Sequence, residues 1–521
     1  MSQPLLMVYF TADSVKYAFA TKTFVTTDTI NGMAAGTLVE GRLQQPGLMR
    51  RDMYGQGAVR GEVPISTGAI QLANTDGELD ALRDVPMDGV LFVLATVVNG
   101  DVSKIIRAGY LEQAVAESED FITLPVRDVQ HAMDKLDLME DRYAGTNALP
   151  AGIEGTAADI KGRVKPLVVG KVFNVSPVCV NTSRLIYQVD GQRGFVTGWS
   201  LTVYDKRSTL TAGANYTSQA DMETNAPAAG QYRVWPSGGC FRLGSSPTGQ
   251  VTADCTNPPT ASAACTVSNV LKYFADPLFT FTPDYTSDPE VGIYLTESTS
   301  WLAAFNEVAA SVQAFLTQGW APWVGAGLQW GGWSSHLMPA ASLPYTPVSV
   351  DLTVSNIVPG SMRQVLPGDA TRGLPVWRVN VHYKKNYTVM SPADLAGVAL
   401  ADQAFCEQAF RTVSKSQTSV LIDYPDALEL DIPTLLVDAT EAETEAQRLL
   451  DLFKVKRNVF SLKVQMEDIR IQLGSSIDFF SIGVAATLTY PRHGFDAGVD
   501  MVIIGAEENF AEDTVDLIVW G

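Results

Sequence analysis

Three of the five cysteines lie close together near the middle of the 521-residue chain, and they are the first candidates for chemistry. Cys240 and Cys255 flank a turn-rich stretch, and Cys265 follows soon after. Zinc sites need closer cysteine pairs or added histidines, and iron–sulfur sites need four thiolates within reach. The segment from 245 to 249 predicts a turn that pairs its two flanks as a β-hairpin. Two interpretations stay open: a disulfide among Cys240, Cys255 and Cys265, or free thiols that act as small apolar side chains.

The other reactive residue types show no catalytic pattern. The four histidines are too far apart in the sequence for a local zinc motif; they are His131, His336, His382 and His493. The sequence has no nucleophile elbow, no phosphate-binding loop and no dinucleotide-binding glycine pattern. The stretch from Asn74 to Asp80 is rich in oxygen ligands but lacks the spacing of a calcium loop, so a turn is favoured. We therefore expect no catalytic residue, no cofactor and no metal.

An aromatic-rich segment between Trp320 and Trp333 allows two interpretations. It could form a platform for a carbohydrate or a peptide. Because Phe315, Leu316 and Val324 lie beside it in the sequence, burial in a core or in a subunit interface is favoured.

The composition indicates a globular and acidic protein. Hydrophobic residues make up 46% and charged residues 18%, which is unlike the composition of disordered chains. The formal net charge of −20 opposes binding to nucleic acid without regard to sequence, although an acidic wall would suit a passage through which DNA moves. The first residues do not look like a secretory signal, and no apolar run reaches the ~18–20 residues that span a bilayer. We expect no membrane-spanning segment.

The alternation of apolar and polar residues predicts mostly strands with a few helices. A hairpin turn is expected at Asn99-Gly100, between two apolar runs. Helices are expected at 128–138, 301–316, 392–413 and 439–457. The last of these follows Asp438 or Thr440 and carries acidic residues at its start. Strands are expected near the end of the sequence at 459–466, 483–490, 499–504 and 515–520.

These elements predict a β-rich α+β protein with several domains. The chain is longer than a single hydrophobic core usually supports. The predicted domains are an N-terminal small β-barrel (1–145), a β-rich crossover and insertion domain (146–275), a mixed α/β domain (276–375), and a helical segment followed by barrel-like strands (376–521).

The order of several short motifs resembles the tail hub proteins of long-tailed bacteriophages and gene transfer agents, which are also called baseplate or tail-tip hubs. The motifs are the strand and Asn-Thr-Asp-Gly turn at 68–80, Leu-Pro-Val-Arg-Asp at 124–128, the Lys-Pro to Asn-Val stretch at 162–175, the Phe-Arg-Leu to Thr-Ala-Asp stretch at 241–254, the acidic helix around 446–450, and the stretch 494–521. The resemblance rests on their order and spans most of the chain.

The resemblance implies a structural protein without catalysis. Similar hubs are homotrimers whose barrels form a ring at the distal end of the tail tube, at the tail tip or baseplate of the virion. The implied partners are the distal tail protein, the tape measure protein, central tip or fibre proteins, and DNA that passes through the lumen without sequence-specific binding. Such proteins are made and assembled in the host cytoplasm. Some relatives bind an iron–sulfur cluster through clustered cysteines, and this sequence departs from that pattern.

A second class of function stays open. The chain could be a tail-tip protein that binds a host receptor or degrades the host envelope. The aromatic segment and the long insertion at 205–265 leave room for this, whereas the missing catalytic motifs favour the structural hub.

Overall fold

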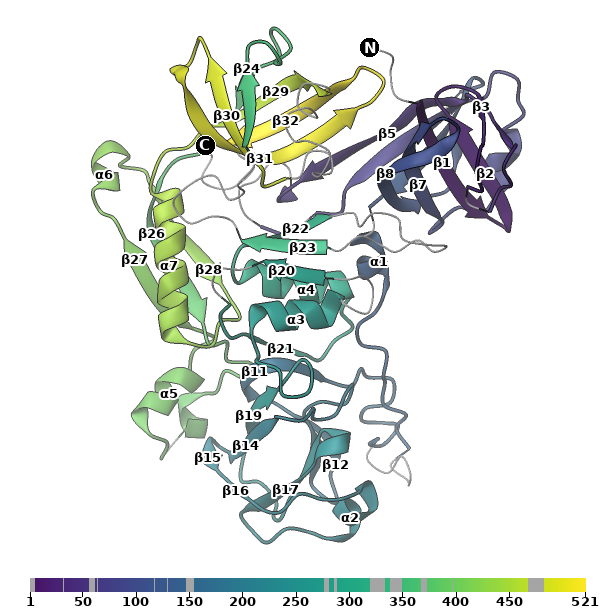
Figure 1. Cartoon of the computed structure of the whole chain (residues 1–521). Helices are drawn as coiled ribbons and strands as arrows, with labels where there is room; N and C mark the ends of the chain where they lie inside the picture. The colour runs from purple at the N-terminus through teal and green to yellow at the C-terminus, as the bar shows by residue number, and fades with distance from the viewer. Residues whose placement is uncertain are drawn as a thin grey trace. The chain divides into compact units, whose positions relative to one another are not determined.

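The computed structural model describes residues 5–30, 32–55, 61–62, 64–116, 118–128, 130–146, 154–275, 281–284, 288–318, 333–337, 349–366, 373–395, 397–466 and 482–521 (Figure 1). The chain divides into two compact units, and each is built from segments far apart in the sequence. Unit 1 comprises Met1–Met133, Phe315–Pro375 and Val455–Gly521, and unit 2 comprises Asp134–Ala314 and Val376–Lys454. The boundaries of these two units differ from those of the four consecutive domains expected from the sequence. The division into four domains stays a prediction.

Unit 1 is built almost entirely from strands. Its early elements are β1 (Leu5–Ala12), β2 (Val15–Ala20), β3 (Phe24–Val25), β4 (Leu38–Val39), β5 (Leu43–Asp52), β6 (Thr67–Ala73), the short helix η2 (Asp80–Asp84), β7 (Leu91–Val98), β8 (Asp101–Leu111), β9 (Val115–Ala116), β10 (Phe121–Arg127) and α1 (Gln130–Lys135). Its later strands are β24 (Ser349–Thr353), β25 (Arg363–Val365), β29 (Val459–Gln465), β30 (Ala485–Tyr490), β31 (Phe495–Asn509) and β32 (Thr514–Trp520). Strands β22 (Ala314–Gln318) and β23 (Trp333–Leu337) lie between these two groups in the sequence.

The first strands of unit 1 are buried on both faces. In β1, Leu6, Val8 and Phe10 belong to one hydrophobic core, whereas Met7 and Tyr9 belong to another on the opposite side. This follows from the alternation of side chains along a strand, because every residue of the apolar run then finds an apolar neighbour. The first of these cores also contains residues of the C-terminal strands.

The predicted turn at Asn99-Gly100 is confirmed. It joins β7 to β8, which pair antiparallel. Asn99 has a φ of 54° and Gly100 a φ of 82°, the left-handed backbone that a two-residue hairpin turn needs at both positions.

Strands from the two ends of the sequence join in one sheet. The order of this sheet is β2-β1-β7-β8-β10-β6-β5-β31-β32-β29-β25. The junction is the antiparallel pairing of β5 with β31, in which Arg51 lies opposite Ala506. The amide N–H of Met53 extends it by donating to the carbonyl of Ile504 at 2.7 Å. Unit 1 therefore forms only when early and late parts of the chain come together.

A buried ion pair crosses the same junction. The guanidinium of Arg107 on β8 donates to the carboxylate of Glu508 on β31 at 2.7 Å, and each side chain is 3% exposed. Burial lowers the pKa of Arg107 to about 10, which leaves it charged at neutral pH. The pair therefore fixes two strands that are far apart in the sequence through charges that water does not screen.

Among the described residues, three sheets lie wholly within unit 2, together with most of the helices. Its first part has β11 (Leu167–Val175), β12 (Val178–Asn181), β13 (Ile186–Gln188), β14 (Ser200–Asp205), β15 (Ser208–Thr209), β16 (Thr211–Ala212), α2 (Gln219–Thr224), β17 (Gln231–Trp235), the short helix η3 (Pro236–Gly238), β18 (Cys240–Leu243), β19 (Val251–Asn257), α3 (Val267–Ala275), β20 (Phe281–Asp284), β21 (Gly292–Leu295) and α4 (Trp301–Ala310). Its second part has β26 (Val376–Tyr383), the short helix η4 (Pro392–Leu395), α5 (Leu400–Cys406), β27 (Arg411–Ser416), α6 (Val420–Asp423), β28 (Leu428–Pro433) and α7 (Ala439–Phe453).

Two five-stranded sheets of unit 2 share one core. Their orders are β15-β14-β19-β11-β21 and β12-β13-β18-β17-β16. Apolar side chains of both sheets meet in this core, including Val172 and Ala253 from the first sheet and Val234 and Phe241 from the second. A smaller sheet, β27-β26-β28, packs against α7. Together with unit 1, these sheets confirm the predicted β-rich, multidomain α+β fold.

Two of the four predicted helices are confirmed, and the other two end before the predicted residue. Helix α1 lies within 128–138, and α7 begins after Asp438, whose carboxylate accepts hydrogen bonds from the amides of Thr440 and Glu441, so both predictions are confirmed. The helix expected at 392–413 is wrong beyond Cys406. Gly397 interrupts it with a φ of 89°, and the chain from Arg411 pairs with β26 as a strand. The helix expected at 301–316 ends earlier, at Ala310.

No helix in the described part of the chain combines the length and the apolar character that crossing a membrane requires.

Breaking the buried pair tests whether it holds unit 1 together. Replacing Arg107 by Met leaves the Glu508 carboxylate buried without this partner, and we expect the free energy of unfolding to fall by about 3–5 kcal/mol. The double variant Arg107→Met/Glu508→Leu should recover much of that loss, because neither charge remains. Chemical denaturation followed by circular dichroism measures both effects.

The matched control for this test is Lys463→Met, which removes a more exposed pair between Lys463 and Glu512 (3.1 Å) in the same unit. The control should cost less than about 1 kcal/mol. An Arg107→Met variant that is no less stable than the control would contradict the importance of the buried pair.

Candidate binding pocket

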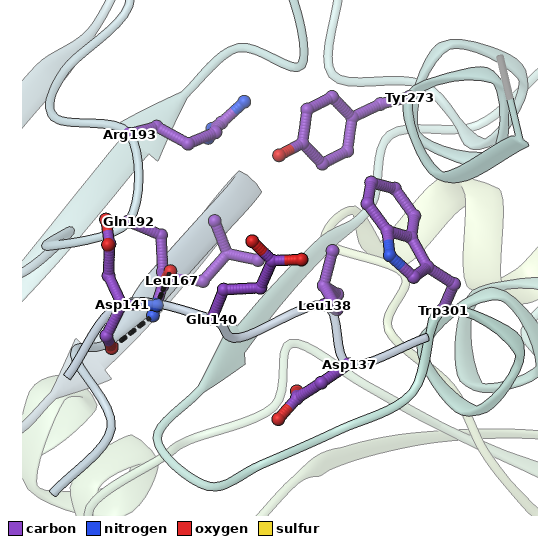
Figure 2. A pocket seen from close by; sticks show the side chains of 9 residues that line it. All are labelled: Asp137, Leu138, Glu140, Asp141, Leu167, Gln192, Arg193, Tyr273 and Trp301. Atoms are coloured by element: carbon purple, nitrogen blue, oxygen red, sulfur yellow. Dashed lines mark hydrogen bonds between the residues drawn. The ribbon is translucent and has the colours of Figure 1, made fainter. Parts of the chain in front are cut away.

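A surface pocket of about 280 Å³ lies within unit 2 (Figure 2). Five segments form it: the stretch that follows α1, the start of β11, the turn after β13, helix α3 and the start of α4. The lining residues are Asp137, Leu138, Glu140, Asp141, Leu167, Gln192, Arg193, Tyr273 and Trp301.

Hydrogen bonds hold the stretch after α1 in place. The amide N–H of Leu138 donates to the carbonyl of Thr299 at 2.8 Å. The side chain of Gln192 accepts from the amide of Asp141 at 3.1 Å and donates to its carbonyl at 3.0 Å. The same amide nitrogen of Gln192 also donates to the carbonyl of Lys165 at 2.8 Å. One glutamine therefore fixes the wall that carries the acidic residues.

Both terminal nitrogens of the Arg193 guanidinium bind backbone carbonyls of the protein. Its guanidinium donates to the carbonyls of Val168 and Pro259, and it lies over the ring of Tyr273 at 4.8 Å from the ring centre. The carboxylate of Asp190 lies 3.6 Å from the guanidinium and is completely buried. The guanidinium of Arg193 therefore holds the segments of the pocket wall together.

Asp190 is held by several donors. The side-chain amide of Asn257 donates to it at 2.7 Å and the amide N–H of Arg193 at 3.0 Å. Burial raises the pKa of Asp190 to about 6, although Arg193 and the hydrogen bonds lower it. At neutral pH the carboxylate is therefore mainly ionised and balances the charge of Arg193.

Two aromatic rings form the opposite wall. Tyr273 on α3 and Trp301 at the start of α4 lie with their ring centres 6.2 Å apart. The side-chain hydroxyl of Ser300 accepts from the amide of Ala303 and so caps α4. Burial raises the pKa of Tyr273, which keeps its hydroxyl protonated at neutral pH. Figure 2 shows that this hydroxyl points toward the middle of the pocket.

The three acidic residues of the pocket differ in their surroundings. Burial raises the pKa of Asp137, but hydrogen bonds from Ser298 and from the amide of Met139 outweigh this effect and the pKa is lowered. Glu140 and Asp141 are exposed, and their carboxylates have no hydrogen bond or ion pair with any other described residue. Figure 2 shows the Glu140 carboxylate reaching toward the middle of the pocket. The available charge in the pocket is therefore negative.

The cysteines lie apart from this lining. All five are described, and each is a free thiol in the structure. Cys240 lies on β18 and Cys255 on β19, which belong to different sheets, so the predicted hairpin between them is wrong. Leu243 pairs with β17, whereas Val251 pairs with β14, because both flanks carry apolar residues that the shared core takes up. The disulfide among Cys240, Cys255 and Cys265 is not formed in this structure.

The sequence did not predict the pocket. Residues 139–165 are rich in Gly and Ala, a composition typical of a linker, and it does not single out the acidic residues at the start of this range. The pairing of Gln192 with Asp141 joins segments that no local pattern connects. The aromatic segment that was considered for binding falls mainly at 319–332, outside the described residues. Within the described residues, no three His, Cys, Asp or Glu side chains are grouped as a metal site requires.

Comparison of the structure with solved structures finds tail proteins. One is the tail protein from Neisseria meningitidis MC58, with 9% identity, a TM-score of 0.43, and coverage of 99% of this chain and 96% of that chain. Another is the 43 kDa tail protein of prophage MuSo2 from Shewanella oneidensis, with 8% identity, a TM-score of 0.42, and coverage of 100% and 98%. A third is the prophage tail protein gp18 from Listeria monocytogenes EGD-e, with 6% identity, a TM-score of 0.42, and coverage of 100% and 94%. No protein-family model and no curated protein matches the sequence.

The cysteine assignment can be tested by alkylation without reductant. Burial raises the pKa of Cys240 and Cys255 and raises that of Cys265 to about 11, so these thiols should react slowly in the native protein. Cys179 is only half-buried and serves as the internal control that reacts first. After unfolding in guanidinium, mass spectrometry should find all of these thiols alkylated. A disulfide-linked peptide that contains Cys240, Cys255 or Cys265 would contradict the free-thiol structure.

Proposed function

We propose that this chain is a structural hub of a phage-type tail tip or baseplate and acts without catalysis. In this role three copies form a ring that joins the tail tube and the distal tail ring to a central tip or fibre. The ring encloses the end of the tape measure protein and opens for the exit of DNA. The proposal rests on one observation: two of the motifs that carry the resemblance to tail hubs supply hydrogen bonds and a close backbone crossing on which the local fold depends.

The first such motif is the turn at 74–80. The side chain of Asn74 accepts from the amide of Leu79 at 2.8 Å and donates to Asp80 at 2.7 Å. Arg42, which directly precedes β5, donates to both carboxylate oxygens of Asp76, at 2.8 and 2.7 Å, and to Glu78 at 2.7 Å. These hydrogen bonds lower the pKa of Asp76 to about 2. The motif therefore builds a rigid loop on the sheet.

The second motif is the stretch that ends in Gly170 to Val175. Gly170 has a φ of 93°, and a side-chain carbon there would lie 2.2 Å from the carbonyl oxygen of Val291. Only glycine fits this crossing of β11 and β21. Asn174 is completely buried with a φ of 51°, and its side-chain amide donates to Asn386 at 2.9 Å and to the carbonyl of Thr388 at 2.6 Å. This asparagine joins two parts of unit 2 that are far apart in the sequence.

The charge of the chain supports the proposed passage of DNA. A net charge of −20 repels the phosphate backbone, so DNA that moves through a lumen of such subunits would not adhere to its wall. A scaffold of this kind needs rigid sheets and complementary surfaces, and it needs no nucleophile or metal.

The self-association of the purified chain tests the proposal. Mass photometry should find a species with three times the mass of the chain, because a closed ring needs copies that bind one another. Incubation with peptidoglycan should leave the polymer intact. A strict monomer that hydrolyses peptidoglycan would overturn the hub proposal and favour an envelope-degrading tail protein.

A further inference from the structure

We propose that the pocket of unit 2 binds a lysine or arginine side chain presented by a partner protein. This inference goes beyond the hub proposal and does not depend on it, because it rests only on the geometry and charge of the pocket. The chemistry is that of a cation with an apolar stem.

The charge of the pocket selects a cation. Glu140 and Asp141 are its available charged groups, since Asp137 accepts hydrogen bonds from its own surroundings. Arg193 faces the buried carboxylate of Asp190 at 3.6 Å, and its two terminal nitrogens donate to backbone carbonyls. The hydroxyl of Tyr273 is a donor that an anion could use (Figure 2), but the net charge left over in the pocket belongs to the exposed Glu140 and Asp141 side chains. That charge repels an anion and attracts a cation.

The shape of the pocket suits a long side chain. Leu138 and Leu167 supply apolar surface and are 8% and 1% exposed. The rings of Tyr273 and Trp301 stand on the side opposite to Glu140 (Figure 2). The rings can pack against the methylene stem of lysine or arginine, while the charged head at its tip reaches the Glu140 carboxylate in the middle of the pocket (Figure 2). An aromatic ring next to the head adds a favourable cation–π contact.

A bare metal ion fits the pocket less well. Among the described residues, no three His, Cys, Asp or Glu side chains are grouped as a metal site requires, and the tyrosine hydroxyl is the one side-chain oxygen of the aromatic and leucine walls. The exposure of Glu140 and Asp141 leaves the charged side of the pocket accessible, so a side chain on another protein can enter without local unfolding. A basic side chain can contact the acidic residues with its charged head and the aromatic rings and leucines with its apolar stem.

Short peptides can probe the pocket in the full chain. The probes are acetylated and amidated Gly-Arg-Gly and Gly-Lys-Gly, with Gly-norleucine-Gly as the uncharged control, followed by saturation-transfer NMR. We expect the two basic peptides to bind with a Kd in the range of about 1 mM, as suits a single side chain, and the control peptide to bind at least about tenfold more weakly. Raising the salt concentration should weaken the binding of the basic peptides.

Charge-neutral variants assign the binding to this pocket. Glu140→Gln and Asp141→Asn together should raise the Kd of both basic peptides about tenfold, because exposed side chains can be exchanged without disturbing the fold. The matched control Glu119→Gln removes an exposed charge in unit 1 and should bind as the original chain does. Circular dichroism checks that each variant is folded.

Three results would overturn the inference: no binding of the basic peptides at tens of millimolar, equal binding of the norleucine peptide, or unchanged binding in the Glu140→Gln/Asp141→Asn variant. Because none of these readouts involves self-association, failure here leaves the hub proposal standing, and failure of the hub proposal leaves this inference standing.

Discussion

The pairing of β5 with β31 is the constraint on which unit 1 depends. It joins a strand near the start of the sequence to one near its end, and the buried pair of Arg107 and Glu508 crosses the same junction at 2.7 Å. Pairing over such a separation is slow to form and entropically costly, so the contact must be strong and specific once it is made. A buried ion pair meets that need, because an arrangement that buries either charge without its partner is strongly destabilised.

Unit 2 uses buried polar side chains in a similar way. Asn174 bonds to Asn386 and Thr388, and Asp190 bonds to Asn257 beside Arg193. Each group is satisfied only when distant segments take their correct places, which favours one arrangement over other ways of stacking similar strands. These buried contacts also shape the pocket, since Arg193 binds groups of the protein interior while the exposed carboxylates of Glu140 and Asp141 stay available for a ligand.

The sequence predicts a turn, helix or strand well where residues close together in the sequence determine it. The Asn99-Gly100 turn, the helix that follows Asp438 and the C-terminal strands all have short-range signals, and the structure confirms them. The helix predicted through 413 fails because β27 takes its structure from pairing with β26, and tertiary pairing overrides local preference. The hairpin between Cys240 and Cys255 fails for a related reason: each flank has a better partner strand elsewhere. The pocket could not be predicted, because Asp141, Gln192 and Trp301 meet only in the folded chain.

The proposed tail-tip role would account for these features together, since a hub would have to keep its surfaces rigid while neighbouring proteins bind and DNA passes. Immunogold electron microscopy of the particles, with an antibody raised against this chain, tests that role most directly. The account predicts gold particles confined to the distal end of the tail. Labelling along the tail shaft or on the capsid, or a complete absence of label from intact particles, would contradict it.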